Sequence, residues 1–289
     1  MKAPSFCTLV ASCLAGAAAQ AATVSAPSGQ WVPLAGNYDF IADQQTGQPQ
    51  SDIVGNGTNH GFFTTFNNNG NASATDGTLG FRIRLDEAGG NTNNPAFTRV
   101  AWIGIDANQD AALDVFVGLG VQGQDTVIRI YDAGTGANTG PSTTTIASSH
   151  YNSVNADSTN YNYRPVNSGT GPTQDGGTTN DLTPGGTDTD YYVSFFVNFQ
   201  TLVTFLQTQG ISITDQSDLR YVMATSTQWN SLNQDLGGVN GGLSSPLTWG
   251  EIGGFSPLVT ANGSPVPEPA SAALAFLGLG ALALRRRRK

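Results

Sequence analysis

Oxygen-bearing side chains at alternate positions make one short segment of the sequence a candidate metal site. They lie at Asp106, Asn108, Asp110 and Asp114, and Ala112 is placed to add its backbone carbonyl. Ca²⁺ takes about six to eight hard oxygen ligands, and alternate positions of a tight loop converge on one point. The spacing therefore predicts a structural Ca²⁺ site formed by these five residues, a closed oxygen cage with no open position for a substrate.

A turn without a metal is the alternative interpretation of this segment. The calcium loop of helix–loop–helix proteins has a central Gly and a final Glu, where this chain has Ala111 and Val117. Asp114 would supply the missing carboxylate, as in shorter loops of the form D-x-[DN]-x-D-x-x-x-D. Asp and Asn also favour hairpin turns through their own hydrogen bonds, so the bare turn stays open.

A second acidic region is weaker. Asn233, Gln234 and Asp235 form a polar run, and Asp215 and Asp218 precede it in the sequence. A second ion there is the minor alternative to solvated turn residues.

The residues that catalysis needs are few and scattered. The two histidines, His60 and His150, lie among Gly, Asn and Ser and have no partner at metal-binding spacing. No Gly-x-Ser-x-Gly elbow or phosphate-binding loop occurs. Before Glu268 near the C-terminus, the only glutamates are Glu87 and Glu251. We predict that the protein is not an enzyme, with a glycoside hydrolase that pairs Glu87 with an Asp as the remaining catalytic alternative.

Three tyrosines suggest a further binding hypothesis. Tyr151, Tyr161 and Tyr163 lie in a polar stretch and would stack on sugar rings if they formed an exposed platform. The alternative, that they fasten a long loop to a sheet, is favoured.

The elements that must position these residues are predicted to be short strands. In one run Phe81, Ile83 and Leu85 alternate with Arg82 and Arg84, so apolar and basic side chains take opposite faces. Similar runs rich in β-branched and aromatic residues cover 97–105, 113–119, 127–131, 191–197 and 219–225. Polar turns separate them, which favours an all-β fold, an antiparallel β-sandwich of jelly-roll-like type.

One short helix is expected beside this sheet structure. Its apolar residues follow helical spacing at Phe199, Leu202, Val203 and Leu206, with Asn198 as the N-cap and Gly210 just past the end. Residues 133–190 are dominated by Gly, Thr, Asn and Ser, and predict either a surface excursion with weak strands or a flexible loop.

Charge excludes one class of partner. The chain has 12 Lys and Arg against 21 Asp and Glu, a net charge of −9. Six of the basic residues lie at the two ends, and the rest of the chain has no Lys. An acidic surface repels phosphate backbones, so we expect no nucleic-acid partner. With 38% apolar and 11% charged residues, the chain is expected to fold.

The N-terminal residues 1–22 are typical of a cleavable secretory signal. Lys2 precedes an apolar run, and Ala19-Gln20-Ala21 fits the small-x-small cleavage rule. Both cysteines, Cys7 and Cys13, fall in this segment, and Cys13 leaves a lipoprotein signal as an alternative. The body, taken as residues 23–264, then has no thiol or disulfide.

The C-terminus carries three features in order. Val266-Pro267-Glu268-Pro269 comes first, then an apolar stretch over 270–284, then the basic run 285–289. As a helix the stretch spans about 22 Å, short of the ~30 Å hydrocarbon core, so it predicts transient rather than lasting membrane insertion. The positive-inside rule keeps the basic run in the cytoplasm and the body outside.

This tail over 265–289 resembles the PEP-CTERM sorting signal of exported bacterial proteins. The resemblance implies a membrane-embedded exosortase as partner, which recognises the tail and removes it during transfer to the envelope or outside. It further implies a secreted structural or adhesive protein of the cell surface or extracellular matrix, with the exopolysaccharide of a biofilm as a second partner. A carbohydrate-binding module of that matrix is the alternative function.

Overall fold

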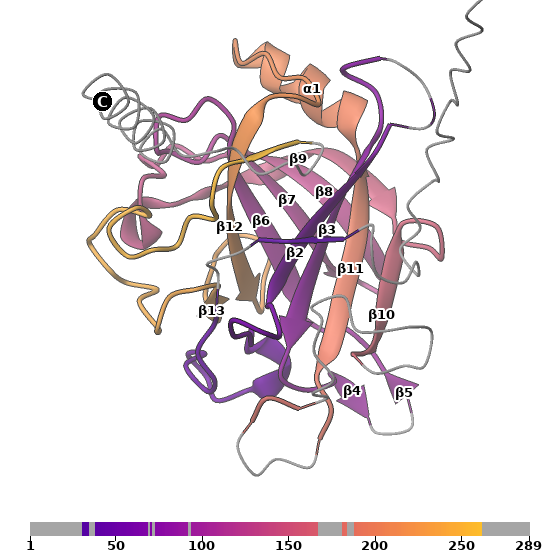
Figure 1. The fold of residues 1–289 in the computed structure, drawn as a ribbon, viewed down its shortest axis with the longest axis vertical. Helices are drawn as coiled ribbons and strands as arrows, with labels where there is room; N and C mark the ends of the chain where they lie inside the picture. Colours follow the sequence, from indigo (N-terminus) through magenta and orange to yellow (C-terminus); the bar gives the residue numbers. More distant parts are fainter. Residues whose placement is uncertain are drawn as a thin grey trace, which may run out of the picture.

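A computed structural model provides the structure of the protein (Figure 1). It describes residues 31–34, 38–68, 70, 73–91, 94–166, 181–183 and 188–261. The predicted N-terminal signal at 1–22 and the sorting tail at 265–289 lie outside these residues.

Two antiparallel sheets form the body. The first sheet has the strand order β1 (Val32–Pro33), β2 (Phe62–Asn67), β3 (Thr78–Leu85), β11 (Tyr191–Asn198) and β10 (Tyr161–Pro165). The second has the order β13 (Asp235–Leu236), β12 (Asp218–Ser226), β6 (Val100–Asp106), β7 (Val115–Gln122), β8 (Asp125–Ala133) and β9 (Ile146–Asn155), with β14 (Val259–Thr260) also paired to β12. A small hairpin, β4 (Gly90–Asn91) and β5 (Asn94–Pro95), joins β3 to β6.

The main core lies between the two sheets. The inward face of β3 contributes Phe81, Ile83 and Leu85, all fully buried in one cluster with side chains of β6, β7 and β12. The ring of Phe81 contacts that of Tyr221 on β12, with centroids 5.4 Å apart. The alternation read from the sequence therefore places apolar side chains inside, and the expected all-β sandwich is confirmed.

The outer faces of both sheets are covered as well. On the first sheet Arg82 is fully buried, and its guanidinium lies over the rings of Trp31 and Tyr192 at 4.2 and 4.9 Å from their centroids. On the second sheet Trp102 and Trp249 are fully buried in a separate apolar cluster. Burial on both faces explains why β6 is buried along its whole length and has no charged residue before Asp106 at its end.

The expected helix is confirmed as α1 (Phe199–Thr208), which connects β11 of the first sheet to β12 of the second and lies at one end of the sandwich (Figure 1). The side chain of Asn198 caps it by accepting a hydrogen bond from the backbone N–H of Thr201 at 2.9 Å. Two single turns of 3₁₀ helix, η1 (Pro49–Ser51) and η2 (Pro141–Thr143), complete the elements described.

Within the described parts of the polar stretch 133–190, β9 and β10 are strands, which agrees there with the first of the two alternatives. β9 pairs with β8, and β10 pairs with β11, although most of β9 faces solvent. Within the ranges that the structure describes, no helix has the length and apolar character needed to cross a bilayer.

Candidate functional site

The predicted calcium loop connects β6 to β7 and is closed by its own hydrogen bonds. One carboxylate oxygen of Asp114 accepts hydrogen bonds from the backbone N–H groups of Ala107 and Asn108 at 2.7 and 3.3 Å. Asp110 accepts from the backbone N–H of Ala112 at 2.9 Å. The loop is thus a compact turn in which acidic side chains satisfy the backbone.

Asp106 at the end of β6 is neutralised by an arginine from the neighbouring strand. Its side chain is fully buried and forms an ion pair with Arg220 of β12, its partner in the sheet register. The same oxygen also accepts from the backbone N–H of Ala111 at 3.1 Å. The second oxygen, Oδ1, is buried and has no hydrogen-bond partner.

Burial raises the pKa of Asp114 to about 6. The hydrogen bonds from Ala107 and Asn108 act against this shift, and the charges of Asp110 and Asp106 add to it. The loop thus holds three carboxylates that repel one another, and of these only Asp106 is paired with an arginine, Arg220. The calcium site at this loop stays a prediction.

Two other groups bring acidic side chains closer together. Within the described part of the chain, one group joins Asp39, Asp43 and Asp235, and the other joins Asp86, Asp181 and Asp190. In each group, one carboxylate oxygen from every residue lies within 4.8 Å of the others. The loop at Asp106 forms no such group.

The first group is assembled from two distant segments. Asp39 and Asp43 lie on the N-terminal segment 38–55, whereas Asp235 begins β13. In Figure 1 this segment, drawn in indigo, lies near β13 at the end of the sandwich opposite α1. The backbone N–H of Ile53 donates to Asp235 at 2.6 Å, across 182 residues of sequence.

Several oxygens in this first group have no donor. Oδ2 of Asp39, whose side chain is 5% exposed, has no hydrogen-bond partner, and neither has Oδ1 of Asp43. Asp52 is fully buried beside the group and has its Oδ1 unpartnered too, while its Oδ2 accepts from the backbone N–H of Ala42 at 2.7 Å. The side-chain oxygen of Gln44 completes this set of buried acceptors.

The acids of this group raise one another's pKa values. Burial is the largest cause for both Asp39 and Asp235, whose pKa values lie well above the usual range, and the charge of Asp43 adds to both. Burial likewise raises the pKa of Asp52 to about 7. No Arg forms an ion pair with these four carboxylates among the residues described.

The second group differs because a cation is built into it. Asp190 forms a fully buried ion pair with Arg84 at 2.6 Å. Burial still raises the pKa of Asp190 to about 7, against the lowering effect of Arg84. Thr183 also donates a hydrogen bond to Asp86 in this group.

Sequence proximity was a poor guide to the partners of Asp235. Asp218 pairs with Thr260 at the start of β12, whereas Asp235 pairs with Thr225 near its end. Asp235 therefore lies away from Asp218, which does not favour the minor alternative of an ion in this region, and it is buried rather than a solvated turn residue. The neighbours of Asp235 follow from the pairing of β12 with β13 and from the contact of the N-terminal segment with the residues before β13.

The residues considered for catalysis lie apart. His60 packs edge-on against Phe63 of the first sheet, and His150 packs against Tyr131 of the second. Glu251 accepts two hydrogen bonds from Thr248 in an exposed turn. Burial raises the pKa of Glu87, and its acidic neighbours Asp188 and Asp86 add to the shift.

The three tyrosines form no common platform. Tyr163 packs against Phe97 and Tyr191 with centroids 5.8 and 5.0 Å away, and Tyr161 packs on the main core. Tyr151, 47% exposed, lies on β9 against Phe205 of α1.

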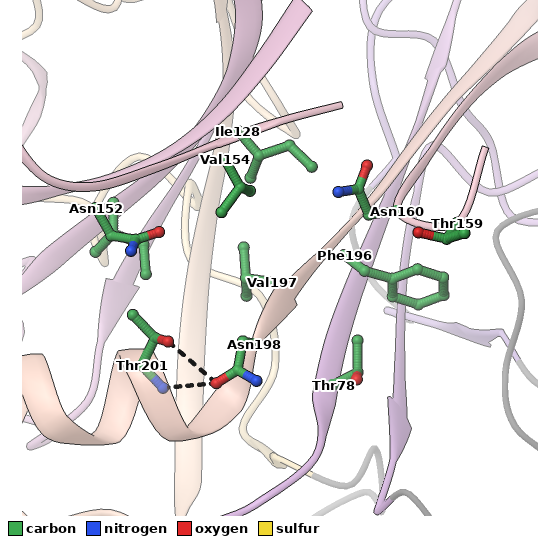
Figure 2. Close-up of a pocket in the computed structure, with 11 residues that line it drawn as sticks. Thr78, Ile128, Asn152, Val154, Thr159, Asn160, Phe196, Val197, Asn198 and Thr201 are labelled. Atoms are coloured by element: carbon green, nitrogen blue, oxygen red, sulfur yellow. Dashed lines mark hydrogen bonds between the residues drawn. The ribbon is translucent and has the colours of Figure 1, made fainter. Parts of the chain in front are cut away.

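A cavity of about 320 Å³ lies at the edge where the two sheets and α1 meet (Figure 2). Asn152 and Val154 of β9 line one side, and Phe196 and Val197 of β11 line the other. Figure 2 also shows Asn160 at the rim, and Asn198 with its oxygen engaged by Thr201. Amides beside apolar side chains suit a small polar ligand.

Comparison with known proteins identifies the C-terminal segment. The PEP-CTERM protein-sorting motif matches residues 265–289, which include Val266, Pro267, Glu268 and Pro269. This confirms the resemblance seen in the sequence, and the motif implies export through the cell envelope and processing by an exosortase, a membrane enzyme. Neither the curated proteins nor the solved structures contain a match to the chain.

Proposed function

We propose that this exported chain with a PEP-CTERM sorting motif is a non-catalytic structural or adhesive protein of the outer surface or extracellular matrix. The observation that carries the proposal is the motif at 265–289, which implies export through the cell envelope. The body is acidic and lacks Lys, so it suits an environment of divalent cations and hydrated neutral glycans.

The arrangement of the body supports a structural role. His60 packs against the first sheet, His150 lies on β9 of the second, and Glu251 is engaged in a turn, which supports a non-catalytic body. Apolar clusters cover both outer faces of the sandwich as well as its interior. Such a body presents polar loops and edges on a rigid frame.

The proposal includes a structural Ca²⁺ at the loop of Asp106, Asn108, Asp110, Ala112 and Asp114. The unpartnered Oδ1 of Asp106 supports it, because a buried oxygen without a donor is available to a cation. Calorimetric titration of the EDTA-treated full chain with CaCl₂ tests it. Asp110→Asn should weaken one binding event, and an unchanged titration would contradict the loop site.

The export proposal is tested by changing Pro267, Glu268 and Pro269 to Ala in the source cells. The wild-type chain should lose its tail and appear on the outer surface or in the matrix fraction. The variant should remain full-length and membrane-associated. Recovery of wild-type chain in the cytoplasm with an intact tail would refute the proposal.

A glycan-binding module is the second candidate, favoured by the cavity between β9 and β11. Its asparagines offer amide donors and acceptors to sugar hydroxyls, beside the apolar Phe196. Neutral polysaccharides arrayed on a surface are the probe. Asn152→Ala and Asn160→Ala should abolish binding under this alternative, with Asn162→Ala on β10, outside the cavity lining, as the matched control. Equal binding by all three variants would exclude the cavity.

A further inference from the structure

The structure assigns a second metal site that is independent of the loop at Asp106. We propose that Asp39, Asp43 and Asp235 bind one Ca²⁺ ion, which fastens the N-terminal segment 38–55 to β13. The proposal goes beyond the sorting role and does not depend on it.

Unpartnered buried oxygens point to a ligand at this place. Buried polar atoms in proteins almost always have a hydrogen-bond partner, so each exception needs an explanation. Here Oδ2 of Asp39 and Oδ1 of Asp43 lack one, and so does Oδ1 of the fully buried Asp52 next to them. A cation satisfies several such oxygens at once, whereas a donor from the chain would satisfy only one or two.

The charge of the group calls for a cation from outside the chain. Four carboxylates act on one another here, and no Arg pairs with them in the part of the chain that is described. Unpaired buried charge is costly unless it coordinates a metal or takes up protons. The site thus favours a divalent ion with a preference for oxygen.

The ligand types in this group suit Ca²⁺, which takes about six to eight oxygens from carboxylates and amide carbonyls. The carboxylate oxygens of the three residues lie within 4.8 Å of one another. Mg²⁺ dehydrates reluctantly and usually keeps several waters, whereas Ca²⁺ accepts a cage built from protein oxygens. Gln44, next to Asp43 in the sequence, also has a buried side-chain oxygen without a partner, and an amide oxygen is a neutral ligand of the type Ca²⁺ accepts.

The neighbouring hydrogen bonds show what the ion would hold together. The backbone N–H of Gln45 donates to the carbonyl of Gln234 at 2.8 Å, and the N–H of Gly241 donates to Asp43 at 2.8 Å. These bonds place the N-terminal segment against the turn around β13. An ion at their centre would make this junction stable outside the cell.

Calcium titration of the EDTA-treated full chain, followed by calorimetry, tests the proposal. Asp39→Asn should remove one binding event or weaken it by at least about tenfold, because affinity follows the number of charged ligands. Asp125→Asn, an equal charge change at an exposed position of β8, is the matched control and should bind as the wild type does. Asp110→Asn should leave this event intact, so the two calcium sites are distinguished.

The effect of calcium on the melting temperature distinguishes a metal ligand from a carboxylate with only a structural role. In EDTA, Asp39→Asn should melt higher than the wild type because it removes buried repulsion. In millimolar CaCl₂ the order should reverse, since only the wild type gains from the ion. Asp43→Asn, at a partly buried position, repeats the test should Asp39→Asn fail to fold.

Three outcomes would overturn the proposal. The first is unchanged calcium binding in both Asp39→Asn and Asp43→Asn. The second is a melting temperature lowered equally with and without calcium, which would mean that the carboxylates hold protons and hydrogen bonds only. Loss of all calcium binding in Asp110→Asn alone would support the loop site and refute this one.

Discussion

Two acidic regions at opposite ends of β12 balance their charge in different ways. At one end Asp106 pairs with Arg220, and the rest of its loop accepts hydrogen bonds from the loop's own backbone. At the other end Asp235 meets Asp39 and Asp43, and some of their oxygens have no partner. In the first region Arg220 balances the charge of Asp106, whereas no Arg pairs with the acids of the second region in the part of the chain that is described.

This difference separates acids that are paired within the chain from acids that have no counter-charge among the described residues. Asp and Asn at alternate positions occur in both calcium loops and ordinary turns, so spacing cannot distinguish them. The unsatisfied buried oxygen is the more specific sign, because leaving it bare costs free energy. By that criterion the group at Asp235 is the stronger metal site and the loop at Asp106 the weaker.

The largest expected effect concerns the buried pair of Arg84 and Asp190, a second place where the chain supplies the cation. The pKa of Asp190 is about 7 in the folded chain and about 4 in the unfolded chain. Between about pH 4 and about pH 7, Asp190 is protonated in the folded chain and ionised in the unfolded chain. The free energy of unfolding in EDTA should therefore fall as the pH rises across this range. The contribution of Asp190 is at most about 4 kcal/mol.

Urea unfolding of the wild type and Asp190→Asn across this pH range measures the effect. The variant cannot titrate at this position, so its stability relative to the wild type should improve as pH rises. The opposite trend would mean that the ion pair with Arg84 dominates over burial and that the pKa of Asp190 is lowered.

Removing Arg220 should be almost as costly, because it leaves Asp106 buried without a counter-charge. We expect Arg220→Met to lower the free energy of unfolding in EDTA by about 3 kcal/mol. Met keeps an apolar contact with Phe255, over which Arg220 stacks. Denaturant unfolding provides the measurement.

Arg129→Met is the control for that substitution, because Arg129 hydrogen-bonds to the neutral side chains of Ser153 and Tyr131. Its loss should be about 1 kcal/mol. If calcium restores the free energy of unfolding of Arg220→Met but not that of the control, a calcium ion at the loop has replaced the positive charge of Arg220. Equal losses in both variants would contradict the importance of the Asp106 pair.

Hydrogen exchange should distinguish the two regions residue by residue. The amides of Ala42 and Ile53 donate to Asp52 and Asp235, so bound calcium should slow their exchange. With calcium at about 100 times its Kd, the linkage amounts to about 2.7 kcal/mol, or roughly 100-fold slower exchange. The amide of Ala111, which donates to Asp106, should change less. Equal slowing of amide exchange in the two acidic regions would contradict the proposed difference between them.

The sequence predicted the fold well because its signals are local. The alternation of Phe81, Ile83 and Leu85 follows from the period of a strand, and Asn198 caps a helix through a bond to Thr201 only three residues on. The burial of Arg82 was not foreseeable from alternation, since it depends on Trp31 and Tyr192 from other segments.

The first acidic group was beyond sequence reasoning for the same physical reason. Asp39 and Asp235 are far apart in the chain, and only the pairing of β12 with β13, together with the docking of the N-terminal segment, brings them together. The loop at Asp106 was found because its residues are neighbours in sequence. Local spacing therefore detected the region in which Arg220 pairs with an acid, and missed the one whose acids have no Arg partner among the described residues.

The smallest expected effect is at Asp110, on the exposed side of the loop. Asn retains a side-chain oxygen for the backbone N–H of Ala112, so Asp110→Asn in EDTA should change the free energy of unfolding by less than about 0.5 kcal/mol. Denaturant unfolding measures it, with Asp125→Asn as the control for charge. A clear increase in the free energy of unfolding in EDTA would show that the hydrogen bonds of the loop and Arg220 do not fully offset the repulsion between its carboxylates. The loop would then also need an external cation, and the contrast between the two ends of β12 would be one of degree.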